Sequence, residues 1–162
     1  MTIWLSQPVA LAMQSHGENF YPLEVGGVVL GWRDGEHRIV TGLVGPGPKS
    51  LHGRHAFVPD HHWQVDQIRK AFTETSGDLD YLGDWHSHPN GAAQMSAMDD
   101  STLSRIARRV ANPLMAIIAG GPSDWQFGGW SANRRALFRR AMISKQPLRI
   151  FEPPSHWPNY GA

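Results

Sequence analysis

Two histidines and an aspartate stand at spacings that suit a single metal ion. In an extended segment residues i and i+2 project to the same side, so His86 and His88 can present ring nitrogens to one point while Ser87 faces away. Asp99 follows in a segment with helical patterning and can swing back toward the histidines. Two imidazoles, one carboxylate and a fourth position open to water are typical of a catalytic zinc site. We therefore predict one zinc ion per chain, bound by His86, His88 and Asp99.

Glu24 is the candidate for the base that hydrolysis also requires. Zinc lowers the pKa of a bound water toward about 7, but a nearby group must still take the proton and return it to a leaving amine. Glu24 opens an apolar segment in which the paired glycines Gly26 and Gly27 allow close approach of another backbone. A carboxylate at the edge of such a strand is partly desolvated, which suits a general base.

The combined pattern resembles the JAMM metalloprotease motif of the JAB/MPN family. That motif is a glutamate, a distant His-x-His-Pro and then Ser-x-x-Asp, and every position is filled here; the resemblance covers roughly residues 10 to 130. It implies an α/β (α+β) fold with a mixed central sheet flanked by helices, of cytidine deaminase-like architecture. It also implies that His86, His88 and Asp99 bind zinc. In the same motif Glu24 is the general acid/base and Ser96 hydrogen-bonds the tetrahedral oxyanion.

The segment 82–85 is similar to the strand before the motif in bacterial members encoded beside ubiquitin-like conjugation enzymes. The resemblance implies a zinc-dependent isopeptidase or peptidase that cleaves after the C-terminal tail of a ubiquitin-like protein, in an antiphage operon with activating and conjugating enzymes. A processing protease for a sulfur-carrier ubiquitin-fold protein is an alternative. A noncatalytic interaction module is another, although such modules generally lose metal ligands that are kept here.

Each fragment of the motif also has a purely structural explanation. Ser96 and Asp99 alone match a capping box, a lone His-x-His is commonly a surface pair, and a glutamate before a strand is commonly a solvated turn residue. The coincidence of all three at the motif's spacings favours the zinc site. Asp100 is an alternative ligand, but the family spacing favours Asp99.

The other histidines compete poorly for a metal. His52 and His55 lie in a Pro/Gly-rich stretch that we expect to be a mobile exposed loop. His61 and His62 begin a predicted helix, where neighbouring side chains diverge by about 100° and cannot easily share one ion. We expect solvated side chains at the remaining positions, which are His16, His37 and His156.

Length and composition predict a single domain over residues 1–162, with a Pro-rich C-terminal extension at about 146–162. The chain has no cysteine, so histidine and carboxylate are the strong zinc ligands available. A formal net charge of +1 argues against a nucleic-acid partner. No apolar run reaches the about 18 residues of a membrane helix and no signal peptide is visible, so we expect a soluble, cytoplasmic protein without membrane contact.

Hydrophobic periodicity predicts the elements that position these residues. Helices are expected at 8–16, 61–75 and 96–110, and strands at 25–32, 37–44, 56–58, 81–85, 114–119, 125–130 and 136–143. Trp85, Trp125 and Trp130 are candidates for lining a substrate groove. Arginines in the second half form either a solvated face or a contact for an acidic partner; they are Arg105, Arg108, Arg109, Arg134, Arg135, Arg139 and Arg140. The tail with Trp157 and Tyr160 either docks as an extended strip or stays loose.

Overall fold

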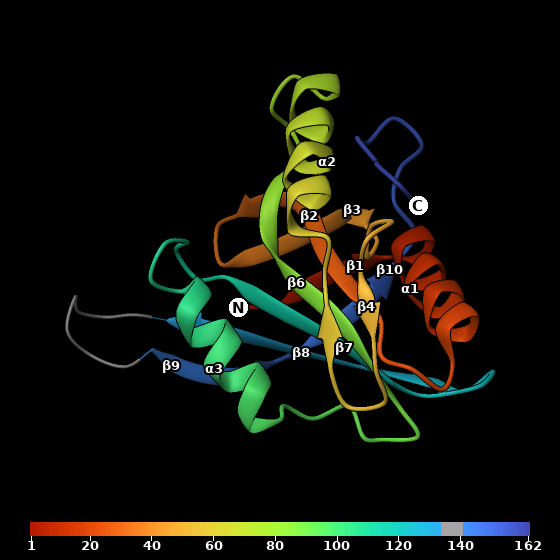
Figure 1. Cartoon of the computed structure of the whole chain (residues 1–162). Coiled ribbons are helices and arrows are strands. Elements are labelled where there is room, and N and C mark those ends of the chain that lie inside the picture. The colour runs from red at the N-terminus through yellow and green to blue at the C-terminus, as the bar shows by residue number, and fades with distance from the viewer. Residues whose placement is uncertain (134–140) are drawn as a thin grey trace.

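A curved eight-stranded mixed sheet forms the centre of the computed structural model, which describes residues 1–133 and 141–162 (Figure 1). The described helices are α1 (Gln7–Phe20), α2 (His61–Glu74) and α3 (Ala97–Ile106). The sheet strands are β1 (Ile3–Ser6), β2 (Gly26–Asp34), β3 (His37–Val44), β6 (Asp80–Pro89), β7 (Leu114–Gly120), β8 (Trp125–Asn133), β9 (Met142–Gln146) and β10 (Leu148–Phe151). Their order is β10-β1-β3-β2-β6-β7-β8-β9, and β4 (Leu51–His52) pairs with β5 (Phe57–Val58) in a separate hairpin.

The two edges of the sheet are formed by strands that follow each other in the chain. Pro147 alone separates β9 from β10, although the two strands lie at opposite ends of the strand order. The sheet must therefore curl strongly. Gly129 on β8 shows how closely its ends approach, because a Cβ added there would lie 2.7 Å from a methyl carbon of Ile3 on β1.

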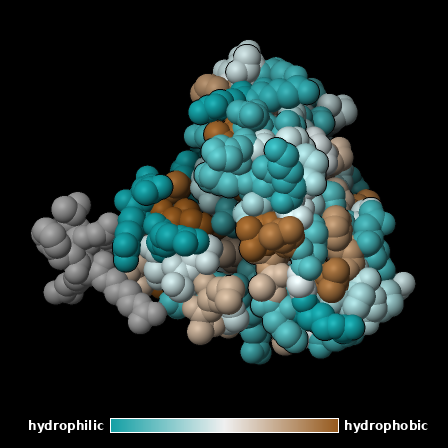
Figure 2. Space-filling model, in the orientation of Figure 1, coloured by the Kyte–Doolittle hydropathy of each residue, from teal (hydrophilic) through white to brown (hydrophobic). Residues whose placement is uncertain are grey.

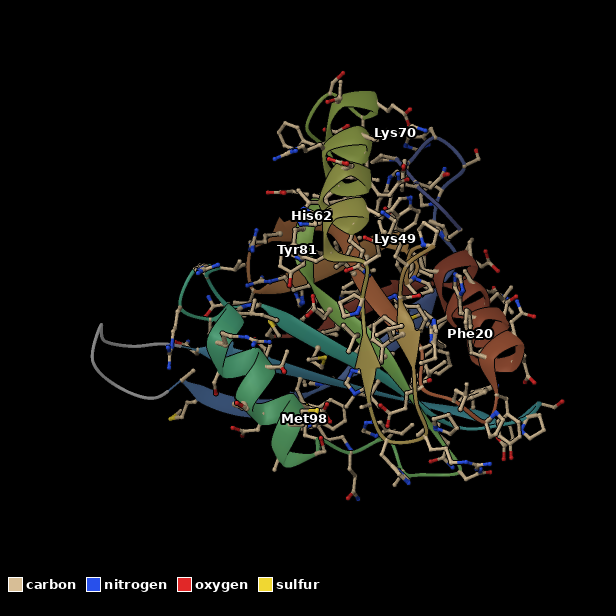
Figure 3. The ribbon with its side chains drawn as sticks, viewed as in Figure 1. Phe20, Lys49, His62, Lys70, Tyr81 and Met98 are labelled. Carbon is tan, nitrogen blue, oxygen red and sulfur yellow. The ribbon has the colours of Figure 1, made fainter. Side chains whose placement is uncertain are left out.

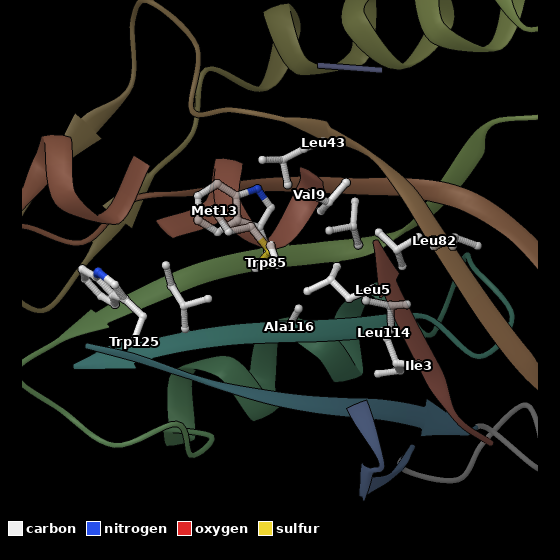
Figure 4. Packing of buried hydrophobic residues seen from close by; sticks show 14 of the residues in the cluster. Ile3, Leu5, Val9, Met13, Leu43, Leu82, Trp85, Leu114, Ala116 and Trp125 are labelled. Carbon is white, nitrogen blue, oxygen red and sulfur yellow. The ribbon is translucent and has the colours of Figure 1, made fainter. Parts of the chain in front are cut away.

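Helices cover both faces of the sheet, as predicted. Alternate residues of β7 belong to different cores: Ala116 and Ile118 pack with α1, whereas Met115 and Ile117 pack with α3. A third cluster joins Ala71 of α2 to residues of β2 and β3. Figure 4 shows the core on the α1 side, where Trp85 and Leu82 of β6 meet Val9 and Met13 of α1. The opposite face, under α2 and α3, is left to carry the polar site.

Several boundaries differ from the sequence prediction. β6 extends to Pro89 and so contains both histidines, because it pairs in parallel with β7 along its whole length to Gly120. α3 ends at Ile106 rather than at residue 110. β1 was not predicted, since four residues carry little periodicity; pairing with β3 on one side and β10 on the other defines it. The predicted strand 136–143 overlaps β9 only at Met142 and Ile143, and its residues 136–140 lie outside the described part of the chain, which omits 134–140.

The C-terminal tail docks on the domain rather than staying loose. Its first part is β10, an edge strand of the main sheet. The Trp157 ring lies 5.1 Å from that of Trp32, and the Tyr160 hydroxyl donates a hydrogen bond of 2.7 Å to Gln67 on α2. The tail therefore packs as an extended strip against strand and helix.

A helix that crosses a membrane must be both long and apolar. Within residues 1–133 and 141–162, none of the helices combines the length and apolarity that a bilayer crossing demands.

Replacing Leu82 with alanine should destabilise the strand that carries the histidines. Leu82 is fully buried in the core beneath α1, so Leu82→Ala should lower the free energy of unfolding by about 2–5 kcal/mol. Leu11→Ala is the matched control, because this leucine of α1 is 56% exposed and its truncation should change stability by less than about 0.5 kcal/mol. Denaturant unfolding of the metal-free proteins measures both, and equal effects would contradict the packing described.

Candidate metal centre

Strand β6 presents both histidines on one face and Ser87 on the other, as the spacing predicts. Ser87 is fully buried; its Oγ accepts a hydrogen bond of 3.0 Å from the Val25 backbone N–H, and its own N–H donates one of 2.8 Å to the Val25 carbonyl. The residue between the two candidate ligands thus ties β6 to the segment that contains Glu24. The register of the sheet agrees, because Gly26 of β2 lies opposite His86.

Ser96 and Asp99 form a capping box at the start of α3. The Ser96 Oγ accepts a hydrogen bond of 3.2 Å from the Asp99 N–H, and an Asp99 oxygen accepts one of 2.7 Å from the Ser96 N–H. The structural explanation for this pair is therefore correct. It does not exclude a metal-binding role, because Asp99 also lies beside both histidines.

The three candidate ligands converge on one point. The Nε2 atoms of His86 and His88 are 3.0 Å apart, and Asp99 oxygens lie 3.1 Å and 3.4 Å from them, respectively. Ligand atoms placed 2.0–2.1 Å from a tetrahedral zinc ion are about 3.3 Å from one another, so these separations fit a bound ion. The His88 Nδ1 lies 3.3 Å from the Ala92 carbonyl, which can only accept; Nδ1 therefore carries the proton and leaves the Nε2 lone pair for a cation.

The electrostatics of the cluster also favour a cation. Burial by itself raises the pKa of Asp99, but hydrogen bonding to His86 and His88 outweighs burial and lowers that pKa well below its usual range. Hydrogen bonding to Asp99 in turn raises the pKa of His88, against the effect of its burial. A carboxylate held ionised in a half-enclosed site calls for positive charge, which a divalent ion would supply.

Glu24 lies next to this cluster although it is distant in sequence. It precedes β2, half-buried, and it lines a cavity of about 630 Å³ together with His88, Ser96 and Asp99. Burial raises the pKa of the Glu24 carboxyl, and the charges of His88 and His86 partly oppose this shift. The partly desolvated carboxylate that the sequence predicted is therefore present.

A second cavity, of about 190 Å³, adjoins the first and is lined by His86. Glu24, Met98 and Asp99 line both cavities, and Trp85 and Arg105 line the second. Met98, at the start of α3, is 63% exposed (Figure 3). Together the two cavities leave space beside Glu24 and all three candidate ligands.

The predicted tryptophan lining is only partly correct. Trp85 lines the second cavity, although only 1% of its surface is exposed. Trp125 and Trp130 are buried in hydrophobic clusters on opposite faces of the sheet instead, because neighbouring strands and helices cover their rings.

Two histidines behave differently from the sequence prediction, although both stay outside the ligand cluster of the described residues. His16 is not solvated: its ring lies 5.7 Å from that of Trp85, and burial lowers its pKa. His52 is not in a mobile exposed loop, because it belongs to the β4–β5 hairpin and contacts the Glu24 backbone. His61 and His62 begin α2, as predicted. The arginines at 134, 135, 139 and 140 lie outside the described residues.

Sequence reasoning missed the supporting roles of His52 and Ser87. The sequence gives no signal for His52, whose partners are set by folding of the hairpin. Ser87 had a signal that was used only in part: a small polar residue that faces away from two ligands on a buried strand needs a hydrogen-bond partner in the interior.

Over most of its length the chain is similar to known proteins. The family model for prokaryotic homologs of the JAB domain matches residues 6–133. A protein of Sinorhizobium fredii named probable metalloprotease y4qB is 33% identical over 148 residues, which are 87% of this chain and 88% of that protein. A protein of Escherichia coli named CD-NTase/cGAS isopeptidase is 27% identical and covers 84% of this chain and 86% of its own length.

A relative of the same name from Vibrio cholerae is 29% identical over 72% of this chain and 74% of its own length. The solution structure of protein DSY2949 from Desulfitobacterium hafniense superposes with a TM-score of 0.72. It covers 96% of this chain and 97% of that one at 21% identity, and therefore supports the fold.

Asp99→Asn should weaken the binding of added Zn²⁺ by more than about 100-fold. Loss of a residue that only supports a metal ligand typically weakens metal binding about 10- to 100-fold. The larger effect is expected because the amide cannot carry the negative charge of a ligand in the cluster. Asp100→Asn is the matched control, since Asp100 is the next residue of α3 and lies outside the cluster. Competition against a chromogenic zinc chelator measures the affinity. Equal losses in the two variants would contradict the assignment of Asp99.

Proposed function

The chain belongs to the prokaryotic homologs of the JAB domain and is a JAMM-type metalloprotease, which we propose to be a zinc-dependent isopeptidase or peptidase. The observation that carries the proposal is that Glu24 lines two adjoining cavities together with the candidate ligands: His88 and Asp99 in the first, and His86 and Asp99 in the second. The complete ligand set favours an enzyme over a noncatalytic module. Relatives named metalloprotease and isopeptidase also support an enzyme.

In this proposal each side chain has a distinct task. His86, His88 and Asp99 hold the ion, which when bound lowers the pKa of water toward about 7 and polarises a carbonyl oxygen. Glu24 accepts the proton of the attacking water and then gives it to the leaving amine. Ser96 lines the cavity; because its Oγ already accepts from the Asp99 N–H, its own proton remains available for the oxyanion.

The substrate we propose is a protein whose C-terminal tail is joined through its last carbonyl to an amine. An extended tail suits the two connected cavities that share Glu24 and Asp99. A ubiquitin-like protein is the first candidate carrier, on the resemblance of the motif and its leading strand, with conjugation enzymes encoded in the same antiphage operon. A CD-NTase or cGAS-like protein is the second candidate carrier, because three relatives are named CD-NTase/cGAS isopeptidase.

Glu24→Gln should retain zinc and lose cleavage, because the amide keeps the shape of the side chain but cannot accept the proton. We would load parent and variant with zinc and present both with two substrate sets. One is a ubiquitin-like protein, and the other a CD-NTase-like protein, each from the neighbouring genes and each joined by its C-terminus to a lysine side chain or to a peptide. Mass spectrometry identifies the bond cut, and metal analysis gives the zinc content.

Cleavage by the parent of one set only would identify the carrier. Undiminished cleavage by Glu24→Gln would remove Glu24 from its proposed role. A folded, zinc-loaded parent that leaves every conjugate of both carriers intact would overturn the proposed function.

Cleavage should be lost at acidic pH as the Glu24 carboxylate becomes protonated, because only the ionised form can take a proton from water. In the metal-free protein burial raises the pKa of the Glu24 carboxyl, so its titration, followed by NMR, should lie above that of an ordinary glutamate, which is about 4.3. A bound dication would lower this pKa, so the acid limb of kcat/KM in the zinc-loaded enzyme should lie below the pKa of Glu24 in the metal-free protein. Bound zinc is measured at each pH, because acid also protonates the histidines. A pKa of Glu24 at or below the ordinary value in the metal-free protein would contradict the burial described.

A further inference from the structure

Glu24 precedes the first residue of β2. Pairing of β2 with β6 brings it to the ligands, and the β4–β5 hairpin holds its own backbone there. The Glu24 N–H donates a hydrogen bond of 2.8 Å to the carbonyl of Gly53, and the Glu24 carbonyl lies 2.9 Å from the His52 Nδ1. Both polar groups of the Glu24 backbone are thus held by two consecutive residues of the hairpin.

The His52 ring is itself fixed in place from three sides. It stacks on Phe20 at the end of α1, with ring centroids 4.0 Å apart and planes inclined by 22° (Figure 3 labels Phe20). The Phe57 ring, from the other hairpin strand, lies 5.4 Å away. The His52 Nε2 lies 2.8 Å from the Ser50 Oγ, and the single proton of that hydroxyl serves either this nitrogen or the Gly47 carbonyl, which is 2.7 Å away.

The direction of the contact with Glu24 follows from its chemistry. A backbone carbonyl can only accept, so the His52 Nδ1 must carry the proton and donate it. A donor held by an aromatic stack on one side and a hydroxyl on the other has little freedom to turn. The carbonyl of Glu24 therefore has a fixed partner on a rigid support.

The same hairpin also reaches the cavity. Arg54 and His55, at its tip, line the cavity that Glu24, His88 and Asp99 also line. His52 and Gly53 of the hairpin hold the backbone of Glu24, and the next two residues form part of the cavity wall. The hairpin is thus placed to set the distance between the Glu24 carboxylate and anything bound there.

We propose that His52 is a positioning residue for Glu24: by donating its Nδ1 proton to the Glu24 carbonyl, it holds the proposed general base at the distance that proton transfer requires. This inference rests on the proposed function of Glu24. Misplacing a reacting group by about 1 Å can reduce a rate about 100-fold, so a contact of this kind can matter without touching the substrate.

Two substitutions separate hydrogen bonding from ring packing. His52→Phe keeps a ring between Phe20 and Phe57 but has no donor, whereas His52→Asn has an amide donor near the position of Nδ1 but no ring. His37→Phe is the matched control, because this exposed histidine at the start of β3 lines neither cavity. Zinc content and thermal unfolding are measured for each variant to establish that the fold and the ligand cluster are intact.

The first measurement needs neither zinc nor substrate. Amide hydrogen exchange at Glu24 in the metal-free protein should become about 10-fold faster in His52→Phe, because one side of its backbone is released while the bond to Gly53 remains. Exchange in α3 should not change, and His37→Phe should match the parent throughout. Unchanged exchange at Glu24 in His52→Phe would overturn the proposal even if the enzyme proves active.

The second measurement is kinetic and uses the conjugate that the parent cleaves. His52→Phe should lower kcat about 10- to 100-fold with little change in KM, and His52→Asn should recover part of that loss despite its missing ring. In a Glu24→Gln background His52→Phe should have almost no further effect, because both act through the same group.

Two kinetic outcomes would overturn the proposal. The first is that His52→Phe lowers the residual kcat of Glu24→Gln by the same factor as it lowers the kcat of the parent. The second is that His52→Phe stays active while His52→Asn is impaired, which would assign His52 to ring packing. An inactive parent would instead count against the proposed function, and the exchange experiment would still test the contact.

Discussion

The antiparallel pairing of β2 with β6 is the constraint on which the candidate site depends. It places Gly26 opposite His86 and so brings Glu24, just outside β2, to the ligands on β6. On its other side β2 has no room for a side chain at Gly27, because an added Cβ would lie 1.9 Å from the carbonyl of Val44 on β3. That carbonyl also accepts a hydrogen bond of 3.2 Å from the Trp85 indole. Close backbone approach and the buried tryptophan therefore fix the register together.

The residues that shape the site also stabilise the elements that carry it. Asp99 completes the cap of α3 and lies beside the two histidines, and a carboxylate in the first turn is favoured by the helix dipole. Ser87 satisfies the Val25 N–H in the interior while its neighbours face the cavity. The same hydrogen bonds therefore stabilise the fold and shape the site, so removing one of them changes both.

The division of the sheet into two faces explains where the site lies. Alternate residues of β7 are apolar on both sides, so α1 covers one face and α3 the other. On the face covered by α2 and α3 the β4–β5 hairpin adds a further layer, with Leu51 68% and Val58 55% exposed on its strands (Figure 2 shows hydrophobic surface over this part of the molecule). The cavities open between the hairpin and the start of α3. The candidate ligands found among the described residues thus lie where these layers leave space.

The sequence by itself determined the local parts of this protein. His86 and His88 two residues apart on a strand, and the Ser96 cap with Asp99 one turn later, follow from periods of 2 and 3.6 that act within a few residues. Only the tertiary structure decided what depends on distant partners. Glu24 meets the cluster through pairing of β2 with β6, the short strands β1 and β10 exist because each pairs with a neighbour, and His52 contacts Glu24 through a hairpin that periodicity does not describe. Local patterns are written in neighbouring side chains, whereas these contacts arise from long-range packing that neighbouring side chains do not encode.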